Sequence, residues 1–190
     1  MGLLIFDKSN KDKNIKKQLS PAKECVFIAT FVAIMVVAQL TLSFVPGVEV
    51  VTVLFVTYAC VMGVKRAIIT GTIFSVVRQI VFGFYPTVLV LYIIYYNLLS
   101  VSFGFLGKKE KDNFKFLMVT VIAACVFTVV FTMIDNVLTP LWYGYSKKAT
   151  QLYFYGSLPF MLMQVINVGI SVLILFFPLK RVFIFVKKKL

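Results

Sequence analysis

Apolar runs follow one another along almost the whole chain, each bounded by proline, glycine or charged residues. Hydrophobic residues make up 61% of the 190 residues and charged residues 14%, far outside the usual composition of a soluble domain. A hydrocarbon core of about 30 Å needs roughly 20 apolar residues for each helix. The sequence therefore predicts an all-α integral membrane protein, a compact bundle of six transmembrane helices within residues 22–180. We place the spans at roughly 22–44, 50–63, 67–83, 86–106, 114–138 and 157–177.

The basic residues indicate the orientation of this bundle, and the formal net charge is +13. If the N-terminus is cytoplasmic, the other side of the membrane receives only Lys147 and Lys148. The positive-inside rule then predicts that both termini are cytoplasmic in a multi-pass protein of the cell membrane. Residues 1–21 would form a basic arm and residues 181–190 a basic tail. Anionic membrane lipid, not nucleic acid, is the partner that this charge predicts. The basic residues on the cytoplasmic side would be Lys8, Lys11, Lys13, Lys16, Lys17, Lys23, Lys65, Arg66, Lys108, Lys109, Lys111, Lys115, Lys180, Arg181, Lys187, Lys188 and Lys189.

The sequence lacks the motifs of most enzymes and of self-powered pumps. It contains no histidine, and Cys25, Cys60 and Cys125 lie singly inside apolar runs, where packing is their simplest role. It has no nucleotide-binding motif, no nucleophile and base pair, and no chain of intramembrane acids. We therefore expect no enzymatic activity and no cofactor, and another subunit would have to drive any uphill transport.

The predicted topology leaves Arg78 as the only basic residue within the membrane, because the lysines at the ends of spans lie on the cytoplasmic side. Gly71, Ser75, Arg78 and Gln79 recur at helical spacing, so they predict one small and polar face that points into the bundle. At 1.5 Å per residue, Arg78 lies about 7.5 Å below the outer end of its span. One interpretation is structural, because a long side chain can reach the outer headgroups or pair with a carboxylate. The other is that Arg78 and Gln79 bind a ligand, since ionisable groups within membranes usually serve function.

Other polar residues also converge on the extracellular half, and they complete the predicted binding site. Asp135 and Asn136 lie near the outer end of the fifth span, where exposure to water is the simpler explanation for them. Interhelical hydrogen bonds would equally explain Gln164 and Asn167 in the sixth span. Glu49 in the first outer loop and Asp135 could each instead pair with Arg78. Asn97 lies beside Tyr92, Tyr95 and Tyr96 in the fourth span. The candidate ligand contacts in this group are Glu49, Asn97, Asp135, Asn136, Gln164 and Asn167.

Aromatic residues crowd the segment between the fifth and sixth spans, which we predict to be an outer loop. They are Trp142, Tyr143, Tyr145, Tyr153, Phe154 and Tyr155. An aromatic belt at the membrane surface is one explanation. A lid that stacks on a planar ligand is the other, and it makes Trp142 and Tyr143 candidate ligand contacts.

The first span contains Ala29 and Ala33, a small-x-x-x-small step that lets another helix backbone approach closely. A short second span follows the loop "PGVEVVTVLF" at residues 46–55. Together with the basic start and the six spans, these features resemble the substrate-binding S component of energy-coupling factor (ECF) vitamin importers. The match at the level of sequence comprises the alanine step and the loop residues Pro46, Val48, Glu49, Val51 and Thr52.

The resemblance implies a function for the whole chain. A vitamin-like small molecule would be captured from outside, in a cavity under the first outer loop. Ala29 and Ala33 would contact the transmembrane coupling subunit, which joins two cytoplasmic ATPases. Two alternatives stay open: a structural or assembly subunit with no ligand pocket, and a membrane-embedded enzyme, which the scarcity of candidate acids and bases disfavours.

Overall fold

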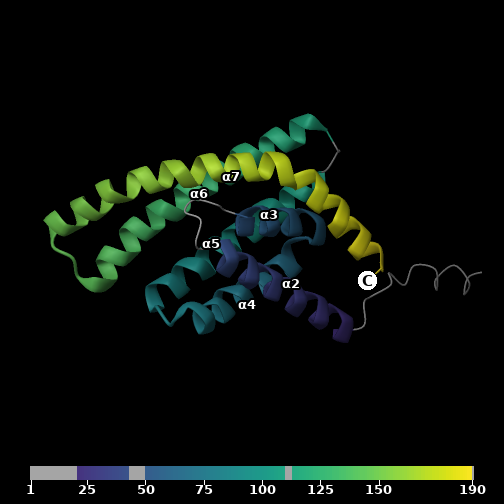
Figure 1. Ribbon diagram of the computed structural model, residues 1–190, viewed down its shortest axis with the longest axis horizontal. Helices are drawn as coiled ribbons and strands as arrows, with labels where there is room; N and C mark the ends of the chain where they lie inside the picture. The colour runs from purple at the N-terminus through teal and green to yellow at the C-terminus, as the bar shows by residue number, and fades with distance from the viewer. Residues whose placement is uncertain (1–20, 43–49, 110–112, 190) are drawn as a thin grey trace, which may run out of the picture.

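The computed structural model describes residues 21–42, 50–109 and 113–189. Over these residues all regular secondary structure is helical (Figure 1), which confirms the predicted all-α class. The elements in chain order are α2 (Pro21–Leu42), α3 (Val50–Met62), α4 (Val64–Phe82), α5 (Pro86–Leu106), the short 3-10 helix η2 (Gly107–Lys109), α6 (Phe114–Tyr143) and α7 (Lys147–Lys189).

Four of the described helices, α2, α5, α6 and α7, are long and apolar enough to cross a membrane. Helix α3 is also apolar, but its 13 residues span only about 20 Å at 1.5 Å per residue. Eleven of those 13 residues are buried, because α3 packs against α2, α4, α5 and α7. A helix that is apolar on all sides is buried by its neighbours. The structure thus supports a helical membrane protein, and the count of six spans stays a prediction.

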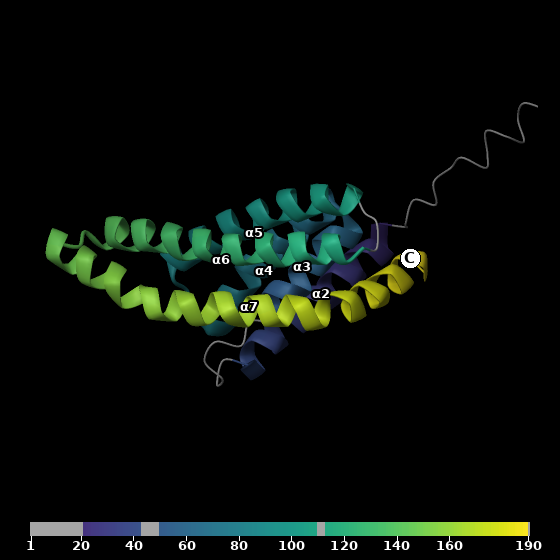
Figure 2. The same ribbon diagram turned by 90° about the horizontal axis from the view of Figure 1, so that it is seen from above.

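Helices α6 and α7 are longer than the sequence predicts. Residues 139–156, expected to form an outer loop, instead continue both helices, and the turn between them is confined to residues 144–146. Gly144 makes this turn with φ 63°, a left-handed conformation that glycine adopts without strain. The α6–α7 hairpin therefore projects beyond the other helices (Figures 1 and 2). Hydropathy marks where a helix leaves the apolar layer, whereas the helix itself can continue into water.

Glycine at position 71 sets the spacing of the central helices. An added Cβ there would lie 2.9 Å from the Cβ of Tyr96 on α5 and 3.0 Å from Cζ of Phe55 on α3. Any larger residue would push α4 away from both helices. Gly71, Ser75 and Gln79 are all buried, which confirms that this face of α4 points into the bundle.

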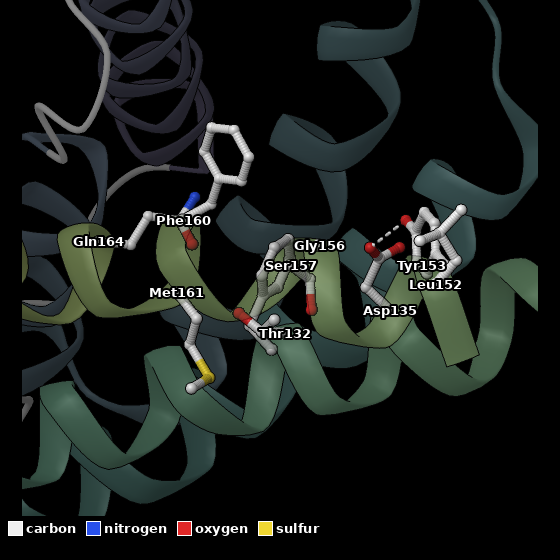
Figure 3. Close-up of a pocket in the computed structure, with 10 residues that line it drawn as sticks. Thr132, Asp135, Leu152, Tyr153, Gly156, Ser157, Phe160, Met161 and Gln164 are labelled. Carbon is white, nitrogen blue, oxygen red and sulfur yellow. Dashed lines mark hydrogen bonds between the residues drawn. The ribbon is translucent and has the colours of Figure 1, made fainter. Parts of the chain in front are cut away.

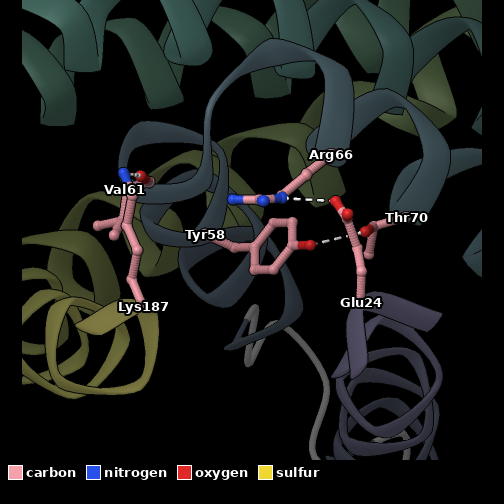
Figure 4. Close-up of polar contacts among 6 residues, drawn as sticks. All are labelled: Glu24, Tyr58, Val61, Arg66, Thr70 and Lys187. Carbon is pink, nitrogen blue, oxygen red and sulfur yellow. Dashed lines mark hydrogen bonds and ion pairs between the residues drawn. The ribbon is translucent and has the colours of Figure 1, made fainter. Parts of the chain in front are cut away.

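One end of the bundle, here called the basic end, carries most of the described charged side chains. Arg66 at the start of α4 binds Glu24 at the start of α2, with Nε 2.6 Å from Oε1 (Figure 4). The hydroxyl of Thr70 donates to that of Tyr58 at 2.9 Å. Lys187 donates to the carbonyl of Val61, one of the last α3 carbonyls, which lack a partner within their own helix.

The C-terminal residues 181–189, predicted to form a basic tail, continue α7 along the basic end. Phe183 is buried there, with its ring edge-on to the rings of Phe31 at 5.3 Å and Tyr58 at 5.8 Å. Lys180 is only 2% exposed, and its ammonium lies near the rings of Phe116 and Phe176. This part of the chain therefore belongs to the packed bundle.

Candidate functional site

The half of the bundle away from the basic end, here called the opposite half, holds the C-terminal halves of α4 and α6 and the N-terminal halves of α5 and α7. A cavity of about 370 Å³ lies there between α6 and α7 (Figure 3). Small-molecule sites in proteins are commonly about 300–1,000 Å³ in volume. The residues that line the cavity are Phe131, Thr132, Asp135, Leu152, Tyr153, Gly156, Ser157, Phe160, Met161 and Gln164.

Asp135 is the charged residue in this wall. Its Oδ1 accepts a hydrogen bond from the Thr139 hydroxyl at 2.7 Å, and its Oδ2 accepts one from the Tyr153 hydroxyl at 2.7 Å. Figure 3 shows the Tyr153 contact at one end of the cavity and Gln164 at the other. Two donors from different helices thus hold the carboxylate in place. In the described part of the chain no lysine or arginine lies within 4.0 Å of it.

A second, smaller cavity of about 80 Å³ adjoins the first. It is lined by residues of α3, α5, α6 and α7, namely Thr52, Tyr92, Tyr95, Tyr96, Thr128, Phe131 and Gln164. Phe131 and Gln164 line both cavities, so these two side chains stand between them. The Phe131 ring packs against Tyr95 at 4.8 Å and Tyr92 at 5.8 Å between centroids. The pair of cavities therefore leads from the α6–α7 hairpin to an aromatic cluster inside the bundle.

Arg78 packs against the Tyr92 ring of this cluster and lines neither cavity. Its guanidinium carbon sits 4.2 Å from the ring centre of Tyr92 and 5.0 Å from that of Phe82. Its Nε is buried without a hydrogen-bond partner. The alternative of an ion pair with Asp135 is wrong, because Thr139 and Tyr153 bind that carboxylate instead. Glu49, the other suggested partner and itself a candidate contact, lies outside the described residues.

Buried polar atoms without partners gather in the opposite half and towards the middle of the bundle. Gln39 donates to the Tyr92 hydroxyl at 3.3 Å, but its Oε1 accepts nothing. Gln79 accepts from the backbone amide of Tyr85 at 3.0 Å, and its Nε2 donates to nothing. Asn97 Oδ1 is also unpartnered. Each such atom costs about 1–3 kcal/mol if it stays unsatisfied, which is a large cost for a folded protein.

Asn136 contacts Ser157, a wall residue of the larger cavity. Its Nδ2 donates to the hydroxyl of Ser157 at 2.8 Å, while its Oδ1 is buried and unpartnered. Of the predicted residues, the structure brings together Asp135, Asn136 and Gln164, and it places Arg78 against the adjoining Tyr92.

Three predicted contacts lie apart from the cavities. Trp142 and Tyr143 are 55% and 52% exposed near the tip of the α6–α7 hairpin, so they do not cover the cavity as a lid. Asn167 is half-buried but lines neither cavity.

Several residues of this region were not predicted from the sequence. Gln39 lines neither cavity but bonds to Tyr92, and as a single amide in a long apolar run it is a signal that was present and overlooked. Thr132, Ser157, Phe160 and Met161 carry no comparable signal, because only the pairing of α6 with α7 brings them together.

The predicted partner surface is exposed. Ala29 and Ala33 both lie on the outside of α2, and the exposed Val26 and Val37 share that side of the helix at helical spacing. Small residues on an exposed apolar helix face let a second helix approach closely within a membrane. The residues that the structure describes therefore leave this face of α2 free for another chain.

Comparison of the chain with models of known families, with curated proteins and with solved structures gives no match. Over residues 21–42, 50–109 and 113–189, no group of three or more histidine, cysteine or acidic side chains is placed to hold a metal ion. The fold and the site together define a helical membrane protein with a polar and aromatic cavity. Any functional assignment must be argued from that cavity.

Proposed function

We propose that this protein is the membrane-embedded binding subunit of an ECF-type importer, which captures a vitamin or related micronutrient from outside the cell. The observation that carries this proposal is the cavity of about 370 Å³ in the opposite half. It has the size of a small-molecule site and combines aromatic rings with a few polar groups, as such sites do. By the Lys/Arg distribution, this half of the protein would face outward.

Binding would use the wall residues without any chemistry on the ligand. The ring faces of Phe131 and Tyr153 offer stacking surfaces for a flat molecule. Gln164, at the junction of the two cavities, would hydrogen-bond a group that reaches inward. Arg78 would act as a positioning residue, because its guanidinium packs over the Tyr92 ring, which lines the smaller cavity.

Release to the cytoplasm would depend on other subunits, since the sequence contains no nucleotide-binding motif. ATP hydrolysis in two partner ATPases would move the coupling subunit, and this movement would reorient the binding subunit in the bilayer. The exposed Ala29 and Ala33 face of α2 is the surface that we assign to the coupling subunit.

Co-purification with the coupling subunit and ATPases of the source organism tests this assignment. Replacing both Ala29 and Ala33 with leucine should abolish the complex, because the added side chains block close helix approach. Ala149→Leu is the matched control, since it adds the same side chain at an exposed position of another helix. A complex that survives the double substitution would contradict the assigned surface.

The orientation is tested by labelling single cysteines in a chain whose own three cysteines are replaced. Ser146→Cys at the α6–α7 turn should react with an impermeant maleimide added to intact cells, whereas Asn113→Cys should not. Both positions are exposed, so the difference reports the side of the membrane. The reverse pattern would place the cavity on the cytoplasmic side and refute capture from outside.

A structural or assembly subunit is the second candidate, and the exposed alanine face of α2 would serve it equally well. This alternative needs no ligand. The two functions therefore differ in whether the purified protein carries a small molecule in its cavity.

A further inference from the structure

The larger cavity contains a negative charge with no positive partner in the described part of the chain. Both carboxylate oxygens of Asp135 accept from neutral hydroxyls, those of Thr139 and Tyr153. Hydroxyl donors stabilise the ionised form of a carboxylate but leave its charge uncompensated. Acidic groups at membrane depth usually face a cation or an aqueous cavity.

Three aromatic side chains share this cavity with the carboxylate. Phe131, Tyr153 and Phe160 all line the cavity, and the Tyr153 ring carries the hydroxyl that binds Asp135. The face of an aromatic ring is negative, so a cation within about 6 Å of its centre is attracted. Phe160 is 70% exposed, so the rest of the chain leaves most of its side chain uncovered. Aromatic rings are the groups with which proteins recognise organic cations, and this cavity combines three of them with a carboxylate.

The other polar groups in and beside the wall also suit a positively charged ligand. Ser157 and Gln164 contribute neutral oxygens that can accept from a cationic donor. Asn136, next to Ser157, has a buried oxygen with no donor. Arg78 does not line the cavity, and Lys147 and Lys148 are exposed at the start of α7 outside the wall.

We propose that this cavity binds a small organic cation, a substituted ammonium or a charged ring nitrogen on a flat apolar body, with the charge against Asp135. The inference rests on the proposed function, since it names the ligand class of the same cavity. It assigns the charge contact to Asp135 and not to Arg78, because the charged wall residue is Asp135.

The test uses three probes of similar shape and different charge: N-methylquinolinium, neutral quinoline and anionic quinaldate. Calorimetry with the full-length protein in phosphatidylcholine nanodiscs at neutral pH measures each affinity, with empty nanodiscs as the blank for partitioning. The cation should bind at least about tenfold more tightly than quinoline, and quinaldate should bind least. Asp135→Asn should bring the affinity for the cation close to that for quinoline. Glu24→Gln is the matched control, since it removes the same charge at the basic end and should leave the affinities for all three probes unchanged.

A second variant keeps the test decisive if Asp135→Asn folds poorly. Phe160→Leu alters a largely exposed side chain. It should lower the affinity for the cation about three- to tenfold and leave the affinity for quinoline unchanged. Equal or tighter binding of quinoline or quinaldate, unchanged cation binding in a folded Asp135→Asn variant, or no binding of any probe would overturn the inference. None of these results would affect co-purification with the ATPase module, so the proposed function is judged separately.

Discussion

The two halves of the bundle differ in how completely their buried polar side chains are hydrogen-bonded. At the basic end, Arg66 binds Glu24, Thr70 binds Tyr58, and the ammonium of Lys187 caps the end of α3. In the opposite half and towards the middle, the side chains of Gln39, Arg78, Gln79, Asn97 and Asn136 each leave a buried atom without a partner. The buried polar groups of one half are satisfied by their own contacts, and in the other half we propose that a bound molecule completes them.

The free energy lost by unpartnered buried atoms is large compared with the stability of a folded domain. A buried polar atom left unsatisfied costs about 1–3 kcal/mol, whereas a whole domain is stable by only about 5–15 kcal/mol. Binding sites are the usual places where a fold keeps such groups unpaired. We therefore expect substitutions at the basic end to change stability and substitutions in the opposite half to change binding.

The largest effect should follow from filling the larger cavity. Gly156 lines it, and an added Cβ there meets nothing within 4 Å, so Gly156→Trp should fold normally and occupy the cavity. We expect the affinity for the bound small molecule to fall at least about 100-fold, or roughly 2.7 kcal/mol. Calorimetry and thermal unfolding of the same purified variant measure both quantities.

Leu162→Trp is the control for that substitution. Leu162 is 59% exposed on the same helix and lines neither cavity, so the bulky ring should leave affinity unchanged. Normal binding by Gly156→Trp would show that the ligand sits elsewhere and would remove the distinction between the two halves.

A smaller effect, of the opposite kind, is expected at the basic end. Arg66→Met strands the Glu24 carboxylate, which is 34% exposed, and should lower the free energy of unfolding by about 1–2 kcal/mol. Ligand affinity should not change, because this ion pair is remote from both cavities. Thermal unfolding in the same detergent is the measurement. A variant of normal stability and weakened binding would reverse our assignment of the halves.

Arg78 should show the smallest change in stability. Arg78→Ala strands no carboxylate in the described part of the chain, so we expect the free energy of unfolding to stay within about 1 kcal/mol. Affinity should fall modestly, by roughly 1 kcal/mol, because the Tyr92 ring loses its support. Arg78→Lys should restore part of this loss, since an ammonium keeps the charge but not the planar stacking. A variant that unfolds readily would identify Arg78 as a structural residue.

Much of the helical fold could be predicted from hydropathy alone. The starts and ends of α2, α3 and α5 agree with the apolar runs to within a few residues, because those helices end where the apolar sequence ends. The hairpin of α6 and α7 could not be predicted in this way. Its tip is rich in charged and aromatic residues, which hydropathy interprets as a loop even though the backbone continues as a helix.

The candidate site was predictable only where one helix carries the signal. Asp135 and Gln164 stand out in apolar runs, and both line the cavity. The packing of Arg78 against Tyr92 could not be predicted, because sequence spacing shows the depth of a side chain but not which ring it contacts. Ser157 and Phe160 became visible only once α6 and α7 were paired.

Native mass spectrometry of the protein purified from cells grown in rich medium tests the central claim most directly. The account predicts that the wild-type chain retains one small molecule and that Gly156→Trp, purified in parallel, retains none. A wild-type protein without any bound small molecule, or a Gly156→Trp variant that carries the same molecule at the same occupancy, would contradict it.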